Sequence, residues 1–238
     1  MDPIVKTISE LFSEQGGVFL SSPEEVSKKL DRIKAYVFDW DGVFNKGSKN
    51  EQGSSDYNEI DSMGINMLRF SHWIRTKNSP WTAIISGEKN TASFQLCSRE
   101  HFTSCYYKVA HKTDALEHLC STLKIKPEEV AFVFDDILDL SIAPKCGLRI
   151  LINRPGVSMV RNYVIEHKLA DYITSGRGEN YALREACEMM IGIKGFWNRV
   201  IDERVGYSPA YQEYLRERNA TDTTYYSRIN QQIEEANP

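Results

Sequence analysis

Two separate pairs of acidic residues each follow a short apolar segment that has the pattern of a buried strand. The first pair is Asp39 and Asp41, and the second pair is Asp135 and Asp136. Because side chains alternate along a strand, Asp39 and Asp41 start on the same side of the chain where the strand ends. Two carboxylates about 4 Å apart repel each other by about 4 kcal/mol at an effective dielectric of about 20. One such pair is compatible with an ordinary acidic turn, but two pairs predict a site that holds a cation or a proton.

Two further strand or helix ends supply polar groups. Ser86 and Gly87 end an apolar segment just before a helix start, where a small hydroxyl and a backbone N–H are suited to hold an anionic oxygen. Lys112 stands in the first turn of an expected helix, where a positive charge opposes the helix dipole and calls for a nearby anion. Taken singly, Ser86-Gly87 is also typical of a turn, and Lys112 of an exposed surface lysine.

In combination, these groups predict a site for a hard divalent cation and a phosphate. Mg²⁺ prefers oxygen ligands and keeps several waters together with a substrate phosphate oxygen. One carboxylate from each strand would supply such ligands, and the remaining carboxylate of the first pair would act as nucleophile or as acid and base. Lys112 would balance the negative charge, and Ser86 would orient the group that is transferred.

The elements that must position these residues alternate between strand and helix. The expected strands are 35–39, 82–85, 104–107, 130–134, 149–152 and 171–173. The expected helices lie near 64–77, 89–99, 112–123, 138–145, 157–167 and 179–191. Such alternation predicts an α/β fold with a parallel sheet that is covered on both faces. The polar stretch 45–55 interrupts the alternation and predicts a projecting hairpin or a flexible loop.

The chain divides into three expected parts. Residues 1–32 form a helical extension, in which Ser22 and Glu25 have the spacing of a capping box. Residues 33–192 form the α/β domain, and residues 193–238 form a C-terminal helical extension that is rich in aromatic side chains. This last part is typical either of an appendage that covers its own domain or of an arm that binds a partner.

Composition excludes several classes of function. A net charge of −4 argues against nucleic acid as a partner, because phosphate backbones select basic surfaces. We expect no membrane partner, since no apolar run is long enough to span a bilayer, and the first residues lack the pattern of a signal peptide. The five cysteines are an odd number without a C-x-x-C pair, which favours reduced thiols and a cytoplasmic location.

With these residues in order, the sequence resembles the haloacid dehalogenase superfamily of phosphohydrolases. The matching motifs are Asp39-Trp40-Asp41-Gly42-Val43, Ser86-Gly87, Lys112, and Asp135-Asp136 with Asp139. The resemblance implies a Rossmann-like parallel sheet and a mechanism through an aspartyl phosphate. Asp39 would attack phosphorus, and Asp41 would protonate the leaving oxygen and later activate water. Asp39, the backbone carbonyl of Asp41, and Asp135 would hold Mg²⁺, with Asp136 and Asp139 in supporting positions.

Within the superfamily, residues 35–192 resemble the small branch without a large cap domain that dephosphorylates keto-deoxy sugar acids. The resemblance implies a homo-oligomer: in that branch a hairpin after the first motif helps to form a tetramer, in which neighbouring subunits cover each other's sites. Residues 45–60 are placed to act as this hairpin. The small phosphorylated substrate would contact residues near the motifs and on the following helix. These expected phosphate- and substrate-binding residues are Ser86, Gly87, Gly42, Glu88 and Arg99.

Three residues depart from the family pattern. Phe134 replaces a glycine before the second acid pair, Trp40 is unusually large between the first two acids, and Lys46 replaces an acid. We expect the Trp40 side chain to point to the opposite face of the strand. Phe134 and the aromatic C-terminal extension leave open a catalytically weak or inactive module for binding or assembly. A phosphotransferase with an acceptor other than water is a further alternative.

Overall fold

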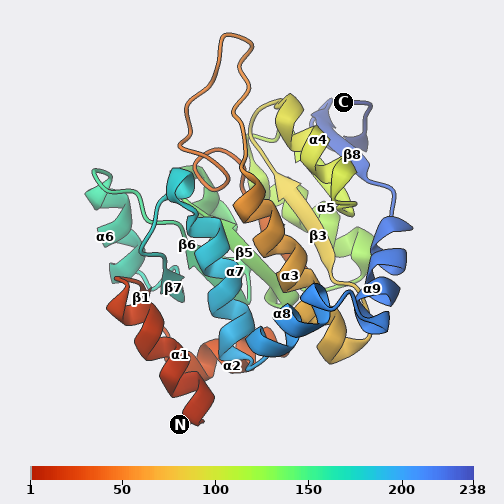
Figure 1. The fold of residues 1–238 in the computed structure, drawn as a ribbon. Helices are drawn as coiled ribbons and strands as arrows, with labels where there is room; N and C mark the ends of the chain where they lie inside the picture. The colour runs from red at the N-terminus through yellow and green to blue at the C-terminus, as the bar shows by residue number, and fades with distance from the viewer. Residues whose placement is uncertain (1) are drawn as a thin grey trace.

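The computed structural model describes residues 2–238, so that only Met1 of the expected N-terminal extension lies outside the described residues. A nine-stranded sheet lies at its centre, in the order β1-β7-β6-β5-β2-β3-β4-β8-β9 (Figure 1). The strands are β1 (Val18–Phe19), β2 (Ala35–Phe38), β3 (Trp81–Ile85), β4 (Ser104–Tyr107), β5 (Val130–Phe134), β6 (Leu148–Leu151), β7 (Tyr172–Ile173), β8 (Thr224–Ile229) and β9 (Gln232–Glu235). Among these nine strands of residues 2–238, the two edge strands β1 and β9 alone run antiparallel to their neighbours.

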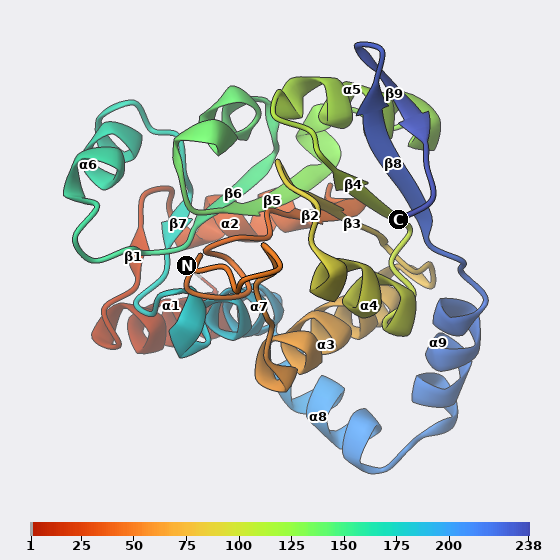
Figure 2. The same cartoon turned by 90° about the horizontal axis from the view of Figure 1, so that it is seen from above.

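Helices cover both faces of the sheet, and Figure 2 shows α5 on one side and α3, α4 and α7 on the other. The α-helices are α1 (Pro3–Glu14), α2 (Pro23–Leu30), α3 (Glu59–Thr76), α4 (Thr91–Arg99), α5 (Lys112–Leu123), α6 (Ser158–Glu166), α7 (Ala182–Ile193), α8 (Trp197–Val205) and α9 (Pro209–Asn219). A hydrophobic core lies on each face of the sheet, and strand β2 contributes side chains to both. Tyr36 and Phe38 belong to one core, and Ala35 and Val37 belong to the other. The predicted doubly covered α/β fold, with extra helices at both ends, is therefore confirmed.

The expected strands agree with the observed ones to within one residue at each end. The helix expected over 138–145 is wrong: this segment forms two 3-10 turns, η2 (Ile137–Ser141) and η3 (Ala143–Lys145). Pro144 lacks an N–H and disfavours a helical conformation at the residue before it. The side chain of Asp139 also accepts the backbone N–H of Asp136, which fixes the first of the two turns.

Strand register brings the predicted site residues to one edge of the sheet. Phe38 pairs with Ile84 of β3 on one side and with Val133 of β5 on the other. The residues that follow these strands, Asp39 and Asp135 among them, therefore emerge together at the carboxyl edge. This edge is the ligand-binding side of a parallel sheet.

The segment between β2 and α3 forms a loop rather than a cap domain. Residues 45–58 contain no helix or strand, and they project from the carboxyl edge of the sheet in Figure 1. Asn50 organises the tip, because its side chain accepts the backbone N–H groups of Gln52 and Ser54. None of the helices in residues 2–238 combines the length and the apolar character that a bilayer span requires.

The C-terminal extension covers its own domain and is only partly helical. Tyr214 of α9 lies 5.2 Å from Phe70 of α3, measured between ring centroids, and Glu217 accepts the indole N–H of Trp73. The prediction of a wholly helical extension is wrong beyond α9, because β8 pairs with β4 in parallel and continues into β9. The sequence Thr223-Thr224-Tyr225-Tyr226 is rich in the β-branched and aromatic residues that favour a strand.

Candidate active site

Asp39 and Lys112 form a buried ion pair at the carboxyl edge of the sheet. Asp39 follows β2, its backbone N–H donates to the carbonyl of Val133, and Nζ of Lys112 lies 2.5 Å from its Oδ1. Burial raises the pKa of Asp39 to about 6, helped by the charge of Asp139 and opposed by Lys112. Burial alone would lower the pKa of Lys112, but the charges of Asp39 and Asp139 outweigh it and raise this pKa. The lysine predicted from its place at a helix start is thus charged and points inward.

Asp135 lies beside this pair, at the end of β5. Its Oδ2 lies 2.5 Å from Nη1 of Arg154, whereas its Oδ1 is buried and has no hydrogen-bond partner within the described residues 2–238. Burial raises the pKa of Asp135 to about 9, and the charges of Asp39 and Asp139 add to the effect despite the nearby Arg154. A buried carboxylate oxygen without a partner is costly, so this position calls for a cation.

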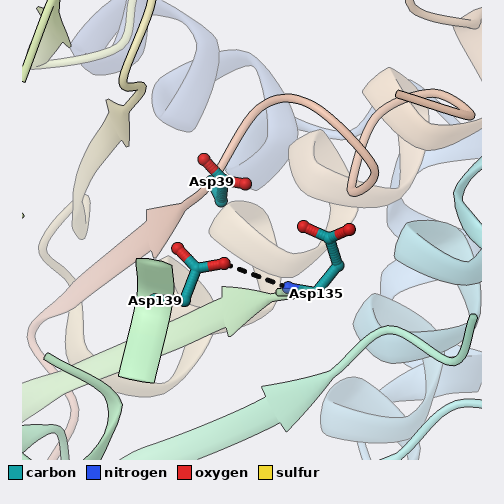
Figure 3. Close-up of side chains that lie close together, drawn as sticks. All are labelled: Asp39, Asp135 and Asp139. Atoms are coloured by element: carbon teal, nitrogen blue, oxygen red, sulfur yellow. Dashed lines mark hydrogen bonds between the residues drawn. The ribbon is translucent and has the colours of Figure 1, made fainter. Parts of the chain in front are cut away.

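Asp139 holds the cluster together from the first turn after β5. Its Oδ1 accepts a hydrogen bond from Nζ of Lys112 at 2.5 Å, and its Oδ2 accepts hydrogen bonds from the backbone N–H groups of Asp135 and Asp136. Figure 3 shows the bond to the Asp135 backbone and the side chains of Asp39, Asp135 and Asp139 around one space. Asp136 lies at the rim, where it caps η2 and is half exposed.

The donor set fits a divalent metal ion. Asp39, Asp135 and Asp139 each offer a carboxylate oxygen, and these three oxygens lie within 4.8 Å of one another. The oxygens of Asp139 are already bound by Lys112 and by backbone N–H groups, which leaves Asp39 and the unpartnered Oδ1 of Asp135 as the better ligands. Oxygen-only donors of this kind suit a hard cation. The acid cluster therefore has the composition of a metal site.

Asp41 stands apart from the buried cluster. Its side chain accepts a hydrogen bond from Oγ of Ser55 at 2.5 Å and forms an ion pair with Lys49 at 3.0 Å. Both partners belong to the loop 45–58. Ser55 in turn accepts the indole N–H of Trp40 and the side-chain amide of Asn90, which caps α4. Asp41 is thereby oriented by the projecting loop. Its predicted contribution to a metal runs through its backbone carbonyl and stays a prediction.

Trp40 and Phe134, the two bulky residues between and before the acids, both lie in the core. The ring of Trp40 stacks on Phe44 at 4.6 Å between centroids, and the ring of Phe134 stacks on Phe132 at 5.4 Å. Neither side chain is exposed to solvent. Their size therefore fills the two hydrophobic layers rather than the space above the acids.

Ser86 and Gly87 follow β3 at the same edge. Ser86 is buried, and its Oγ accepts the backbone N–H of Glu88 at 3.3 Å. A Cβ atom on Gly87 would meet no atom of residues 2–238 within 4 Å, so packing within this part of the chain does not require glycine here. A free approach to the backbone at this position is what an anionic ligand needs. Glu88 is exposed beside it.

Arg99 does not join the cluster. It lies in the last turn of α4, where its guanidinium pairs with Glu59 at 2.6 Å and with Glu100 at 3.1 Å. It also donates to Oγ of Ser62. These partners already use the fork of donors that a substrate carboxylate would need, so its predicted role in binding substrate stays a prediction.

The sequence did not reveal three residues that contact the acids: Arg154, Ser55 and Lys49. Arg154 follows β6 and pairs with Asp135 and Asp136, and the signal for it was a basic residue just past another strand of the same sheet. Ser55 contacts Asp41 from fourteen residues away, within a polar loop in which no local pattern distinguishes one serine from its neighbours.

No protein-family model matches the chain. The chain is 28% identical over 188 residues to the 3-deoxy-D-manno-octulosonate 8-phosphate phosphatase KdsC of Escherichia coli (strain B / BL21-DE3), a match that covers 77% of this chain and 90% of that protein. It is 26% identical over 172 residues to the protein of the same name from Yersinia pestis, covering 71% of this chain and 84% of that protein.

Solved structures agree with these relatives. The crystal structure of a probable YrbI family phosphatase from Pseudomonas syringae matches with a TM-score of 0.64 at 28% identity, over 76% of this chain and 98% of that one. The 3-deoxy-D-manno-octulosonate 8-phosphate phosphatase of Moraxella catarrhalis has the same fold, with a TM-score of 0.64 at 23% identity over 76% of this chain and 98% of that one. The chain is thus similar in sequence and in fold to a probable YrbI family phosphatase and to the 3-deoxy-D-manno-octulosonate 8-phosphate phosphatases.

Proposed function

We propose that the chain is a Mg²⁺-dependent phosphomonoester hydrolase that works through an aspartyl phosphate on Asp39. The observation that carries the proposal is the convergence of Asp39, Asp135 and Lys112 from three separate elements on one buried point. A lysine that neutralises a buried carboxylate next to two further acids suits the transfer of a negatively charged phosphoryl group.

Each half of the reaction uses residues of this chain. Oδ of Asp39 attacks phosphorus while the bond from phosphorus to the leaving oxygen breaks, and Asp41 gives that oxygen its proton. In the second half, Asp41 takes a proton from water, whose oxygen attacks phosphorus, releases inorganic phosphate and restores the Asp39 carboxylate. Ser55 and Lys49 hold the Asp41 side chain for both proton transfers.

Asp39, Asp135 and the backbone carbonyl of Asp41 would hold Mg²⁺ in this proposal. When bound, the ion would neutralise negative charge on the phosphoryl oxygens and orient them. Lys112 offsets the charge of Asp39, and Asp139 keeps the lysine in place through its 2.5 Å contact. Ser86 and the backbone beside Gly87 would contact the remaining phosphoryl oxygens.

The proposed substrate is the phosphate ester of a keto-deoxy sugar acid. This follows the activity for which the relatives that match 77% of the chain are named. Glu88 occupies the exposed position just after Gly87, where it would face the sugar rather than the phosphate. Arg99 would contribute only if it exchanged Glu59 or Glu100 for a substrate carboxylate.

The proposal includes a homo-oligomer, with a tetramer as the arrangement to test by light scattering. Apolar side chains close to the acids are unusually exposed: Ile137 by 64%, Leu138 by 62% and Met159 by 81%. Contiguous exposed apolar side chains favour a protein interface. A cytoplasmic location is consistent with five free, buried cysteines.

The test compares wild type with Asp39→Asn on p-nitrophenyl phosphate and on a panel of sugar phosphates, with and without Mg²⁺. Asp39→Asn keeps the size of the side chain but removes its nucleophilicity, so we expect at least about a hundredfold loss of kcat. Asp202→Asn on the exposed face of α8 is the matched control. Undiminished activity of Asp39→Asn would refute the assignment of Asp39 as the nucleophile.

Two other outcomes distinguish the alternative functions. Labelled phosphate that appears mainly on an added acceptor would identify a phosphotransferase, and no turnover across the panel would favour a binding module.

A further inference from the structure

A small cavity of about 190 Å³ lies beside the acid cluster, between the turn at Gly42 and the segments that follow β6 and β7. Three basic side chains line it: Lys46, Arg154 and Arg177. Glu179 is the one acidic residue among its lining residues. The lining therefore carries a net positive charge next to a site whose other side chains are mostly acidic.

Arg154 connects this cavity to the acids. Its Nη1 pairs with Asp135 at 2.5 Å and with Asp136 at 3.4 Å, and none of the hydrogen bonds among residues 2–238 engages its Nε or Nη2. A Cβ atom on Gly47 would lie 3.1 Å from Nη2, so the glycine backbone packs closely against the guanidinium. Arg154 is thus fixed at one end and retains donors for a further acceptor.

Lys46 and Arg177 supply the rest of the positive charge. Lys46 is exposed, and within residues 2–238 no ion pair neutralises it. Among residues 2–238 the one ion pair of Arg177 is with Glu179, at 3.5 Å, and both side chains are partly exposed. An exposed pair of this length is weak, so the Arg177 guanidinium is available for a ligand.

Backbone packing holds the two walls of the cavity together. A Cβ atom on Gly178 would lie 2.3 Å from the carbonyl oxygen of Gly42 and 2.1 Å from that of Asn45. The segment that carries Arg177 is therefore pressed against the turn that follows Asp41. This packing fixes the position of the backbone that carries Arg177 relative to the backbone that carries Asp41.

We propose that this cavity binds the carboxylate of the substrate and so selects acidic sugar phosphates over neutral ones. The inference rests on the proposed function, and it adds the residues that recognise the acid: Lys46 and Arg177, with Arg154 as the fixed wall. The planar fork of a guanidinium matches a carboxylate. Lys112 is fully engaged by Asp39 and Asp139, so a second anionic group on the substrate needs a separate set of cations.

The experiment uses two substrates that differ only at one end, 6-phosphogluconate and sorbitol 6-phosphate, and p-nitrophenyl phosphate as a reference. The variants are Lys46→Gln and Arg177→Gln, because Arg154 also contacts the acids. The matched control is Arg32→Gln, an exposed arginine before β2 at the opposite edge of the sheet. The readout is kcat/KM, or the inhibition constant against p-nitrophenyl phosphate if a sugar phosphate is not hydrolysed.

We expect wild type to prefer 6-phosphogluconate, and each variant to lose about tenfold on it, which corresponds to about 1.4 kcal/mol. Values for sorbitol 6-phosphate and p-nitrophenyl phosphate should change less than about twofold, which is within the range of weak surface effects. Equal losses on the acidic and the neutral compound, or no loss on the acidic one, would overturn the inference while leaving the phosphatase intact. If nothing is hydrolysed, the proposed function fails, and calorimetry with 6-phosphogluconate still tests the cavity: unchanged affinity in both variants would overturn it.

Discussion

Gly42 and Asp135 approach each other so closely that a Cβ atom on residue 42 would lie 2.0 Å from Oδ2 of Asp135. Gly42 also has a φ of +88°, a conformation that residues with a side chain rarely adopt. The two residues come from different strand ends, and their contact joins the first acidic motif to the second. The glycine after Asp41 is therefore needed to bring Asp135 to the site.

Gly42→Ala should displace Asp135 and disrupt the site. The positive φ alone costs about 1–3 kcal/mol, and the clash with the carboxylate adds to it. We expect a lower free energy of unfolding in urea and at least about a hundredfold loss of kcat. Gly87→Ala is the comparison for stability, because its Cβ would meet no protein atom. Wild-type stability and activity in Gly42→Ala would show that the contact is dispensable.

The sequence was sufficient to predict the central strands of the sheet, because they are continuous apolar segments that end in turn residues. β4 and β5 agree with the expected bounds, and the parallel pairing of β2 with β5 agrees with their burial on both faces. The hairpin β8–β9 could not be foreseen in the same way. Its outer strand β9 is largely exposed and charged, so no hydrophobic periodicity marks it. It joins the sheet only by pairing with β8, which in turn pairs with β4.

In the site, too, some residues could be predicted from the sequence and others could not. Asp39 and Asp135 were identifiable because each ends a strand in a recurring local pattern. Ser55 and Arg154 act through contacts that the fold alone creates, a loop that returns to Asp41 and a turn that reaches Asp135. Ser55 carries no local signal, and Arg154 has only its position just past β6, since their partners lie far away in the sequence.

Metal binding should strengthen as the pH rises. The pKa of Asp39 is raised to about 6 and that of Asp135 to about 9, both above the ordinary 3.8. The folded, metal-free protein therefore binds protons more tightly than the unfolded chain, and its free energy of unfolding should fall as the pH rises from about 4 to about 9. Because metal ligands must be ionised, Mg²⁺ should bind with release of protons and restore stability most at the alkaline end.

The measurement is urea unfolding at about pH 5 and about pH 8, with EDTA and then with Mg²⁺. Asp135→Asn removes the group with the larger pKa shift and should flatten the pH dependence. Calorimetric titrations of Mg²⁺ in buffers of different ionisation enthalpy count the released protons. A Mg²⁺ affinity that stays constant over this pH range would contradict the assignment of these acids as ligands.

Lys112→Met should destabilise the protein strongly. It leaves Asp39 and Asp139 buried without their common cation, and breaking a buried ion pair from one side costs about 3–5 kcal/mol. Unfolding in urea measures the change, and Lys145→Met, which breaks an exposed pair with Glu117, should alter stability by less than about 1 kcal/mol. The double variant Lys112→Met/Asp139→Asn should recover part of the loss. A single variant within about 1 kcal/mol of wild type would refute the ion pair.

Ser55→Ala should impair proton transfer without removing the metal. It deletes the hydrogen bond that orients Asp41, and a hydrogen bond to a charged group contributes about 1.5–3 kcal/mol. Alkyl phosphates depend on a general acid more than p-nitrophenyl phosphate does, so kcat should fall about tenfold or more on the former and less on the latter. Ser54→Ala removes a neighbouring hydroxyl that contacts Asn90 instead. Equal effects of the two variants, or an equal loss on both substrates, would argue against this role.

The most direct test of the central claim is chemical trapping of the intermediate on Asp39. Wild type is mixed with substrate and Mg²⁺, quenched within one turnover and treated with borohydride, which reduces an acyl phosphate of aspartate to homoserine. Mass spectrometry of the digested protein should find homoserine at position 39 in wild type and none in Asp39→Asn. Rapid turnover without any homoserine at position 39, or with homoserine at another aspartate, would contradict the assignment of Asp39 as the nucleophile.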